Sequence, residues 1–138
     1  MAKAAANGIH IEYETFGDSA ARPLLLIGGL ADQLIHWDDE LCRDLSERGH
    51  YVIRFDSRDA GLSTKFDQAG VPDLGALARG EKGPPYTLED MADDAVGLLE
   101  ALDIRKAHIC GASMGGMIAQ TIAIHHPSRL LSLISIYS

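Results

Sequence analysis

Two patterns of apolar and polar positions along the chain predict strands of two kinds. Residues 9–16 follow an Asn7-Gly8 pair, typical of a hairpin turn, and alternate between apolar and more polar positions. We expect an edge-type strand there with one buried face. Other segments are mainly apolar, as in strands that are covered on both sides. These segments are residues 24–27, 51–55, 106–112 and 130–137.

The stretches between these strands carry helical spacing. Trp37, Leu41 and Leu45 recur every four residues, which predicts a helix with one apolar stripe. A second helix is expected to begin at a capping box formed by Thr87 to Asp90. Its apolar face would contain Leu88, Met91, Ala92, Ala95, Leu99 and Leu102. A third helix, from Met114 to His126, is mostly apolar all round and stops before a proline.

The order of these elements is β, β, α, β, α, β, α, β. Alternation of this kind implies right-handed crossovers and a mostly parallel, doubly wound α/β sheet. Residues 56–86 form a long polar stretch with a possible short helix at 73–79. Long loops in compact domains are often functional.

Composition narrows the class of protein. The chain has 138 residues, enough for one domain, with 46% hydrophobic and 23% charged residues. Its net charge of −8 argues against nucleic acid and anionic membrane surfaces as partners. The sequence shows no signal-peptide core and no apolar run of membrane-spanning length. Two cysteines occur, Cys42 and Cys110, and the second sits in an apolar run. A reducing, cytoplasmic location is the simplest expectation.

The segment Gly111-Ala112-Ser113-Met114-Gly115 has the pattern G-x-S-x-G between a predicted strand and a predicted helix. Such a sharp turn strains the serine and lifts its hydroxyl clear of the sheet, while both glycines avoid collisions. The Met114 amide would then point beside the hydroxyl as one donor of an oxyanion hole. The alternative is a tight turn whose glycines serve packing alone.

The second oxyanion donor is expected from the loop after the strand at 24–27. Gly28, Gly29 and Leu30 lie there. Gly29 would let the backbone approach closely, and the Leu30 amide would be the donor. A plain strand-ending turn is the alternative interpretation.

Several segments together resemble the N-terminal half of α/β-hydrolase fold enzymes: LLLIGG, VIRFDSRDAGLST, PYTLEDMADDAVGLLEALDI and HICGASMGGMIAQTIAIHHPSRLLSLISIYS. Within this family, the sequence most resembles the esterase branch that includes aclacinomycin methylesterase-like proteins and cofactor-free haloperoxidases. The resemblance implies Ser113 as nucleophile, Leu30 and Met114 as backbone oxyanion donors, and no cofactor. Gly28 stands where many members carry histidine, so we expect the side-chain hydrogen bond of that turn to be lost.

The loop DSRDAGLS resembles the family's D-x-R-G-x-G-x-S loop, which carries no chemistry in the family. We therefore interpret Asp56, Arg58 and Asp59 as structural, with an arginine–aspartate pair locking the loop.

The sequence does not supply an obvious base for Ser113. In this fold the acid and the histidine follow the serine, but no Asp or Glu follows Ser113 here. His125 and His126 lie roughly 18 Å away along the same helix and suit its carboxyl end. His36 is the nearest histidine, either as a catalytic surrogate or as helix-start packing. The spacing of the histidines, including His10, His50 and His108, suits no metal.

We therefore expect residues 1–138 to form one incomplete α/β-hydrolase-like domain, ending after the strand that follows the nucleophile helix. A truncation, a cleavage product and a short gene product all fit the sequence.

Two functions remain open. The leading one is hydrolysis of a small carboxylic ester through an acyl-enzyme on Ser113. The alternative is a non-catalytic binding or assembly module that keeps the turn for folding. In either case the apolar strand 130–137 would be a sheet edge, which predicts a homodimer or a complementary chain.

Overall fold

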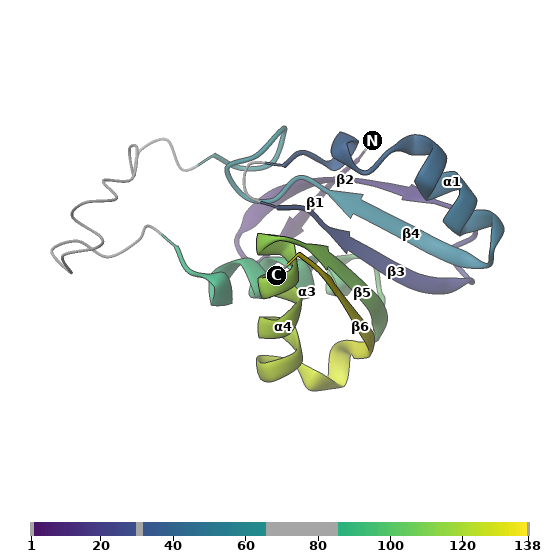
Figure 1. The fold of residues 1–138 in the computed structure, drawn as a ribbon. Coiled ribbons are helices and arrows are strands. Elements are labelled where there is room, and N and C mark those ends of the chain that lie inside the picture. Colours follow the sequence, from purple (N-terminus) through teal and green to yellow (C-terminus); the bar gives the residue numbers. More distant parts are fainter. Residues whose placement is uncertain (1, 30–31, 66–85, 138) are drawn as a thin grey trace, which may run out of the picture.

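A computed structural model describes residues 2–29, 32–65 and 86–137, which form one six-stranded mixed sheet with helices on both faces (Figure 1). The strand order is β1-β2-β4-β3-β5-β6. The strands β3, β4, β5 and β6 are parallel, whereas β1 and β2 are antiparallel to their neighbours. Their bounds are β1 Ala2–Ala6, β2 Ile9–Phe16, β3 Arg22–Ile27, β4 His50–Phe55, β5 Ala107–Ala112 and β6 Leu130–Ile136. The expected mostly parallel α/β sheet is therefore confirmed.

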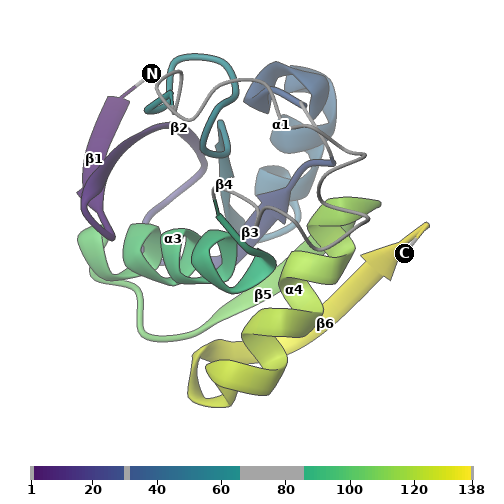
Figure 2. The same cartoon turned by 90° about the vertical axis from the view of Figure 1, so that its left-hand side faces the viewer.

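The helices pack on opposite faces of the sheet, so that a separate hydrophobic layer forms on each face (Figure 2). Helix α1 (Asp39–Glu47) covers one face through Cys42, and helices α3 (Leu88–Ala101) and α4 (Met114–His125) cover the other. Short 3₁₀ turns occur at Leu34–His36 and Pro127–Arg129. None of the helices in the described residues has the length and apolar character needed to cross a membrane.

Alternation along the central strands explains both layers. One set of side chains faces α3 and α4 and belongs to the larger core: Ile11, Leu25, Ile27, Ile53, Phe55 and Ile109. The other set faces α1: Leu24, Leu26, Val52 and Cys110. Both cysteines are free and buried, and burial raises the pKa of each thiol. The prediction of Cys110 as a buried thiol is confirmed.

The first strand corrects the expectation for residues 9–16. We expected β2 to be an edge strand, but β1 pairs with its first five residues, from Ala6 opposite Ile9 to Ala2 opposite Tyr13. The AKAAA segment has no alternating pattern and alanine favours helices, so the sequence hides this strand. The predicted turn is real, because Asn7 and Gly8 have φ values of 50° and 78°.

The helices largely follow their predicted faces, with two differences. Leu41 of the first stripe is 42% exposed, and Cys42 is the residue of α1 that is buried. Leu88 is also exposed, whereas the rest of the α3 stripe is buried or packs on the core. The capping box is confirmed, because the Thr87 amide donates to Asp90 Oδ2 (2.8 Å) and the Asp90 amide donates to Thr87 Oγ1 (3.2 Å). The possible helix at 73–79 lies outside the described residues.

Strand β6 is the outer strand of the described sheet. Leu131 and Leu133 on one face and Ile134 and Ile136 on the other are 36–49% exposed. Its expected position at an apolar edge is therefore confirmed for the described part of the chain.

The first test concerns His50, which begins β4 and meets the His108 ring edge-on at 6.1 Å. Burial lowers the pKa of His50, and the charges of Arg22 and His108 lower it further. A histidine whose pKa is lower in the folded state binds its proton more readily after unfolding. The free energy of unfolding should therefore fall as the pH drops from 7 through the ordinary histidine pKa of about 6.5. In His50→Gln, chemical unfolding from pH 8 to 5 should show a shallower decline.

The exposed His10 gives the matched control. The variant His10→Gln should keep the wild-type pH slope. Equal slopes for wild type and His50→Gln would contradict this assignment.

Candidate active site

Ser113 lies in the sharp turn between β5 and α4. Its backbone has φ 55° and ψ −121°, a conformation that side-chain-bearing residues rarely adopt. Its amide donates to the Ile136 carbonyl oxygen of β6 (2.7 Å), and its own carbonyl accepts from the Gly116 amide (2.9 Å). Strain of this kind costs on the order of 1–3 kcal/mol and is concentrated at functional sites. The strained strand-to-helix turn expected from the sequence is present.

The glycines on either side leave no room for a side chain. A Cβ atom on Gly115 would overlap the Ile27 carbonyl oxygen and lie 2.6 Å from that of Gly28. A Cβ atom on Gly111 would overlap the Gly115 carbonyl and lie 2.6 Å from the Gly116 nitrogen. Helix α4 therefore crosses the ends of β3 and β5 in direct backbone contact.

The Gly28–Gly29 turn closes the other side of the site. A Cβ atom on Gly29 would lie 3.4 Å from Ser113 Cβ and 3.5 Å from the Ala112 carbonyl oxygen. The turn that was expected to provide a donor thus lies directly beside Ser113. Leu30, the predicted second donor, lies outside the described residues.

Asp32 corrects the expectation that this turn lacks a side-chain hydrogen bond. The Gly29 amide donates to Asp32 Oδ2 (2.8 Å), while the Asp32 amide donates back to the Gly29 carbonyl (3.1 Å). A Cβ atom on Gly28 would lie only 2.9 Å from Asp32 Cβ, so glycine at position 28 makes room for the aspartate. Sequence reasoning missed Asp32, although an acidic side chain that reaches back three positions to a backbone amide is the reciprocal half of a capping box.

His36 lies in the 3₁₀ turn before α1, with its side chain about half exposed. Its Nδ1 atom is 3.1 Å from Asp32 Oδ1 and 3.2 Å from the Gln33 amide nitrogen. The structure thus gives His36 a carboxylate partner within the loop that contacts Ser113. Neither its role as a surrogate base nor its alternative role in packing is tested by this geometry.

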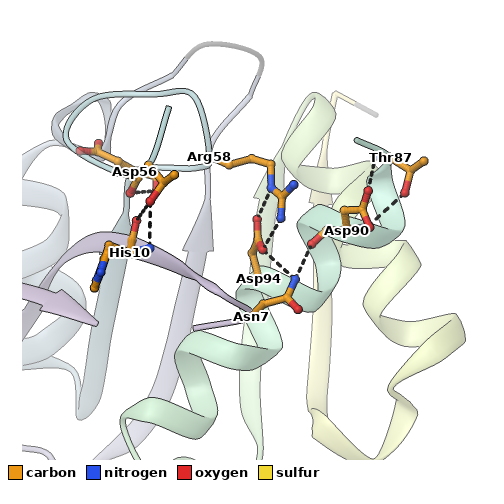
Figure 3. A network of polar contacts seen from close by, with 9 residues as sticks. Asn7, His10, Asp56, Arg58, Thr87, Asp90 and Asp94 are labelled. Atoms are coloured by element: carbon orange, nitrogen blue, oxygen red, sulfur yellow. Dashed lines mark hydrogen bonds and ion pairs between the residues drawn. The ribbon is translucent and has the colours of Figure 1, made fainter. Parts of the chain in front are cut away.

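The loop after β4 is held by two buried acid groups (Figure 3). Asp56 accepts hydrogen bonds from the amides of Leu34 (2.7 Å) and Leu62 (2.8 Å). Arg58 makes a two-pronged ion pair with Asp94 of α3, at 2.6 and 2.7 Å. Asn7 also donates to Asp94 (2.9 Å). A structural role for Asp56 and Arg58 agrees with these contacts, but the partner of Arg58 comes from α3 and was not foreseen.

The other histidines lie in contacts away from the turn. His125 and His126 end α4 and face carboxylates of α3, with His126 Nε2 2.7 Å from Asp93 Oδ1. His108 Nδ1 is 2.6 Å from Ser132 Oγ of β6. Among the residues that the structure describes, none hydrogen bonds to the Ser113 hydroxyl, and no three His, Cys, Asp or Glu side chains gather as a metal site would require.

A parallel sheet with a serine on a strained turn at the carboxyl end of a central strand is the arrangement of α/β hydrolases. A family model described as "alpha/beta hydrolase fold" matches residues 22–138, and the chain belongs to this family.

Three comparisons refine this result. The chain is 39% identical over 120 residues to a rhodomycin D methylesterase of Streptomyces sp. (strain C5). This alignment covers 87% of this chain and 36% of the relative. It is 31% identical to a putative carbamate hydrolase of Variovorax paradoxus, and this alignment covers 90% of this chain and 41% of the relative. A crystal structure of the enol-lactonase from Burkholderia xenovorans superposes with a TM-score of 0.74 and 30% sequence identity. The superposition covers 94% of this chain and 44% of the enol-lactonase chain. The chain thus spans well under half the length of these relatives.

The second test concerns the backbone contact at Gly115. Even the small change Gly115→Ala should prevent the native fold, because its Cβ would overlap backbone atoms that cannot move independently. We expect loss of cooperative thermal unfolding, with Gly115→Val at least as damaged. Gly8→Asn is the control, since a Cβ there meets nothing within 4 Å and asparagine tolerates positive φ. A cooperatively folded Gly115→Ala protein would contradict this packing.

Proposed function

We propose that this chain carries the nucleophile half of a hydrolase that cleaves small carboxylic esters, with Ser113 as the nucleophile. The observation that carries the proposal is the strained backbone of Ser113 (φ 55°), held directly against the Gly29 turn. A fold does not by itself imply a reaction, but this local geometry and the hydrolase relatives both support an ester-cleaving nucleophile at Ser113.

The proposed chemistry is acyl transfer in two steps. The Ser113 hydroxyl oxygen attacks the ester carbonyl carbon while its proton passes to a base. The resulting oxyanion would accept hydrogen bonds from the Met114 amide, at the first position of α4, and from the Leu30 amide. The bond to the alcohol oxygen then breaks, and the alcohol leaves with the proton. Water repeats the sequence on the acyl-enzyme and releases the acid.

We propose that the histidine base and its carboxylate partner come from polypeptide additional to these 138 residues. The chain spans 36% of the length of the methylesterase relative, and no Asp or Glu follows Ser113 in the sequence. The Asp32–His36 pair is the second candidate, because its carboxylate and Ser113 flank the same glycine.

The relatives suggest the substrate class. Their names describe a methylesterase, a putative carbamate hydrolase and an enol-lactonase, which share attack on an acyl carbon. We therefore propose a small-molecule ester as substrate. A net charge of −8 and two free cysteines favour a cytoplasmic protein that does not bind nucleic acid.

The third test uses a fluorophosphonate probe and p-nitrophenyl acetate on the purified chain. We expect slow labelling at Ser113, located by peptide mass spectrometry, because an oxyanion hole without its base retains part of the catalysis. The variant Ser113→Ala should remove both labelling and turnover, with a change in unfolding free energy below about 1 kcal/mol.

A second variant separates function from folding. Ser113→Gly should also abolish labelling but should not lower the melting temperature, since glycine relieves the positive φ. Wild-type protein that folds but shows no labelling or turnover dependent on Ser113 would contradict the proposal and favour a non-catalytic binding or assembly module.

We further propose that β6 pairs with a second polypeptide, either another copy of this chain or a complementary chain. Its apolar residues on both faces are exposed, and an unpaired apolar edge strand readily adds another strand. Exposed Met117 and Ile124 extend this apolar surface over α4.

The fourth test is light scattering of the chain at micromolar concentration. We expect species larger than the 14.8 kDa monomer, and Ile134→Lys should shift the distribution toward monomer because it places a charge on the edge. Leu62→Lys, at a 58% exposed loop position, should leave the distribution unchanged. A well-folded wild-type monomer would contradict this proposal.

A further inference from the structure

A cavity of about 110 Å³ lies beside the Ser113 turn. The backbone positions that flank Ser113 in space, Gly29 and Met114, form part of its wall. A dry cavity of about 150 Å³ can hold benzene, so this one suits a shorter group of roughly five heavy atoms. Its position makes it accessible to one end of a molecule whose reacting atom rests on Ser113.

The walls of the cavity differ in chemistry. The lining residues include the apolar Met91, Met114 and Ala60 as well as the polar Asp59 and Tyr86. Arg58 also lines the cavity, but its guanidinium is held by both oxygens of Asp94 and lies 5.0 Å from the Tyr86 ring centre. A short carbon chain with a polar end would match both kinds of wall.

Asp59 is presented to the cavity by an unusual backbone. Its φ is 65°, a value that favours glycine but that aspartate tolerates, and its amide donates to the Thr64 carbonyl (2.9 Å). Asp59 is one of the residues that line the cavity, and its backbone is held within the loop by this hydrogen bond.

Tyr86 supplies a neutral donor to that carboxylate. Burial, followed by its hydrogen bond with Asp59, raises the pKa of Tyr86 to about 12, so the phenol keeps its proton at physiological pH. A carboxylate offers about four acceptor positions, so Asp59 can accept from Tyr86 and from another donor together.

We propose that this cavity binds a short carbon chain ending in a hydrogen-bond donor, an alcohol or a primary ammonium, with Asp59 as the acceptor. The proposal rests on the proposed function in one respect, because the donor would belong to the substrate whose ester bond lies at Ser113. Asp59 would then select among substrates, beyond the purely structural role expected for it from the sequence.

The experiment measures binding of three ligands of equal heavy-atom number by amide NMR shifts of Gly29, Ala60 and Met114. Butan-1-ol and butylammonium each carry a donor, whereas diethyl ether carries none. We expect both donors to bind the wild-type chain at least tenfold more tightly than the ether does. In Asp59→Gly, which suits the positive φ, both should weaken at least tenfold, while Asp59→Asn should retain part of the affinity through its amide oxygen.

The control Asp103→Gly makes the same change of charge at another exposed aspartate with positive φ (59°). It should bind all three ligands as the wild type does. Binding of butylammonium without butan-1-ol would assign the site to ammonium groups within the proposal. Equal binding of ether and alcohol, an equal loss in Asp103→Gly, or no binding at all would each overturn it.

The same titration on Ser113→Ala separates this proposal from the catalytic one. Binding that survives there, with no Ser113 labelling in the wild type, would remove the proposed reaction and leave the cavity assignment standing. Labelling at Ser113 without selective binding of the donor ligands would support the proposed reaction and overturn the cavity assignment.

Discussion

The structure depends on one close contact, the crossing of α4 over the carboxyl ends of β3 and β5. Backbone meets backbone there, because a Cβ atom on Gly111 or Gly115 would overlap main-chain atoms. This contact sets where α4 begins, and it holds Ser113 in its strained conformation. The strain itself is stabilised from outside the turn, since the Ser113 amide is bound by the Ile136 carbonyl of β6. The strand at the sheet edge therefore helps to hold the serine in place.

Around this crossing, buried charge fixes the loops that the sheet leaves irregular. Asp56 accepts hydrogen bonds from two loop amides. Arg58 pairs with Asp94 of α3, and Asn7 from the first hairpin donates to the same carboxylate (Figure 3). Removing one partner of such a buried pair leaves an uncompensated charge and commonly costs about 3–5 kcal/mol. The loop after β4, the middle of α3 and the first hairpin are thus held together near the serine.

The sequence predicts the parts of this arrangement that depend on local pattern. Apolar runs locate the central strands, the Thr87 capping box locates α3, and G-x-S-x-G locates the strained turn. The sequence does not reveal β1, because its AKAAA segment is stabilised by pairing with β2 and not by its own strand propensity. Asp94 was missed for a related reason. Its partner Arg58 is brought close by the fold, and a single sequence carries no record of such a contact. The contact of Asp32 with the Gly29 amide is local, so that residue could have been recognised from the sequence.

The turn at Ser113 is well formed, while the strand that binds its amide lies at an exposed edge of the described sheet. The turn at Ser113, the Gly28–Gly29 turn and the loop after β4 all make contacts with other residues of the described part of the chain. Strand β6 has a partner on its β5 side and exposes apolar side chains on both faces. Since the Ser113 amide donates to the Ile136 carbonyl at the end of that strand, a displacement of β6 would also act on the geometry of the serine. The position of the edge strand β6 and the backbone geometry of Ser113 are therefore physically linked at a single hydrogen bond of 2.7 Å.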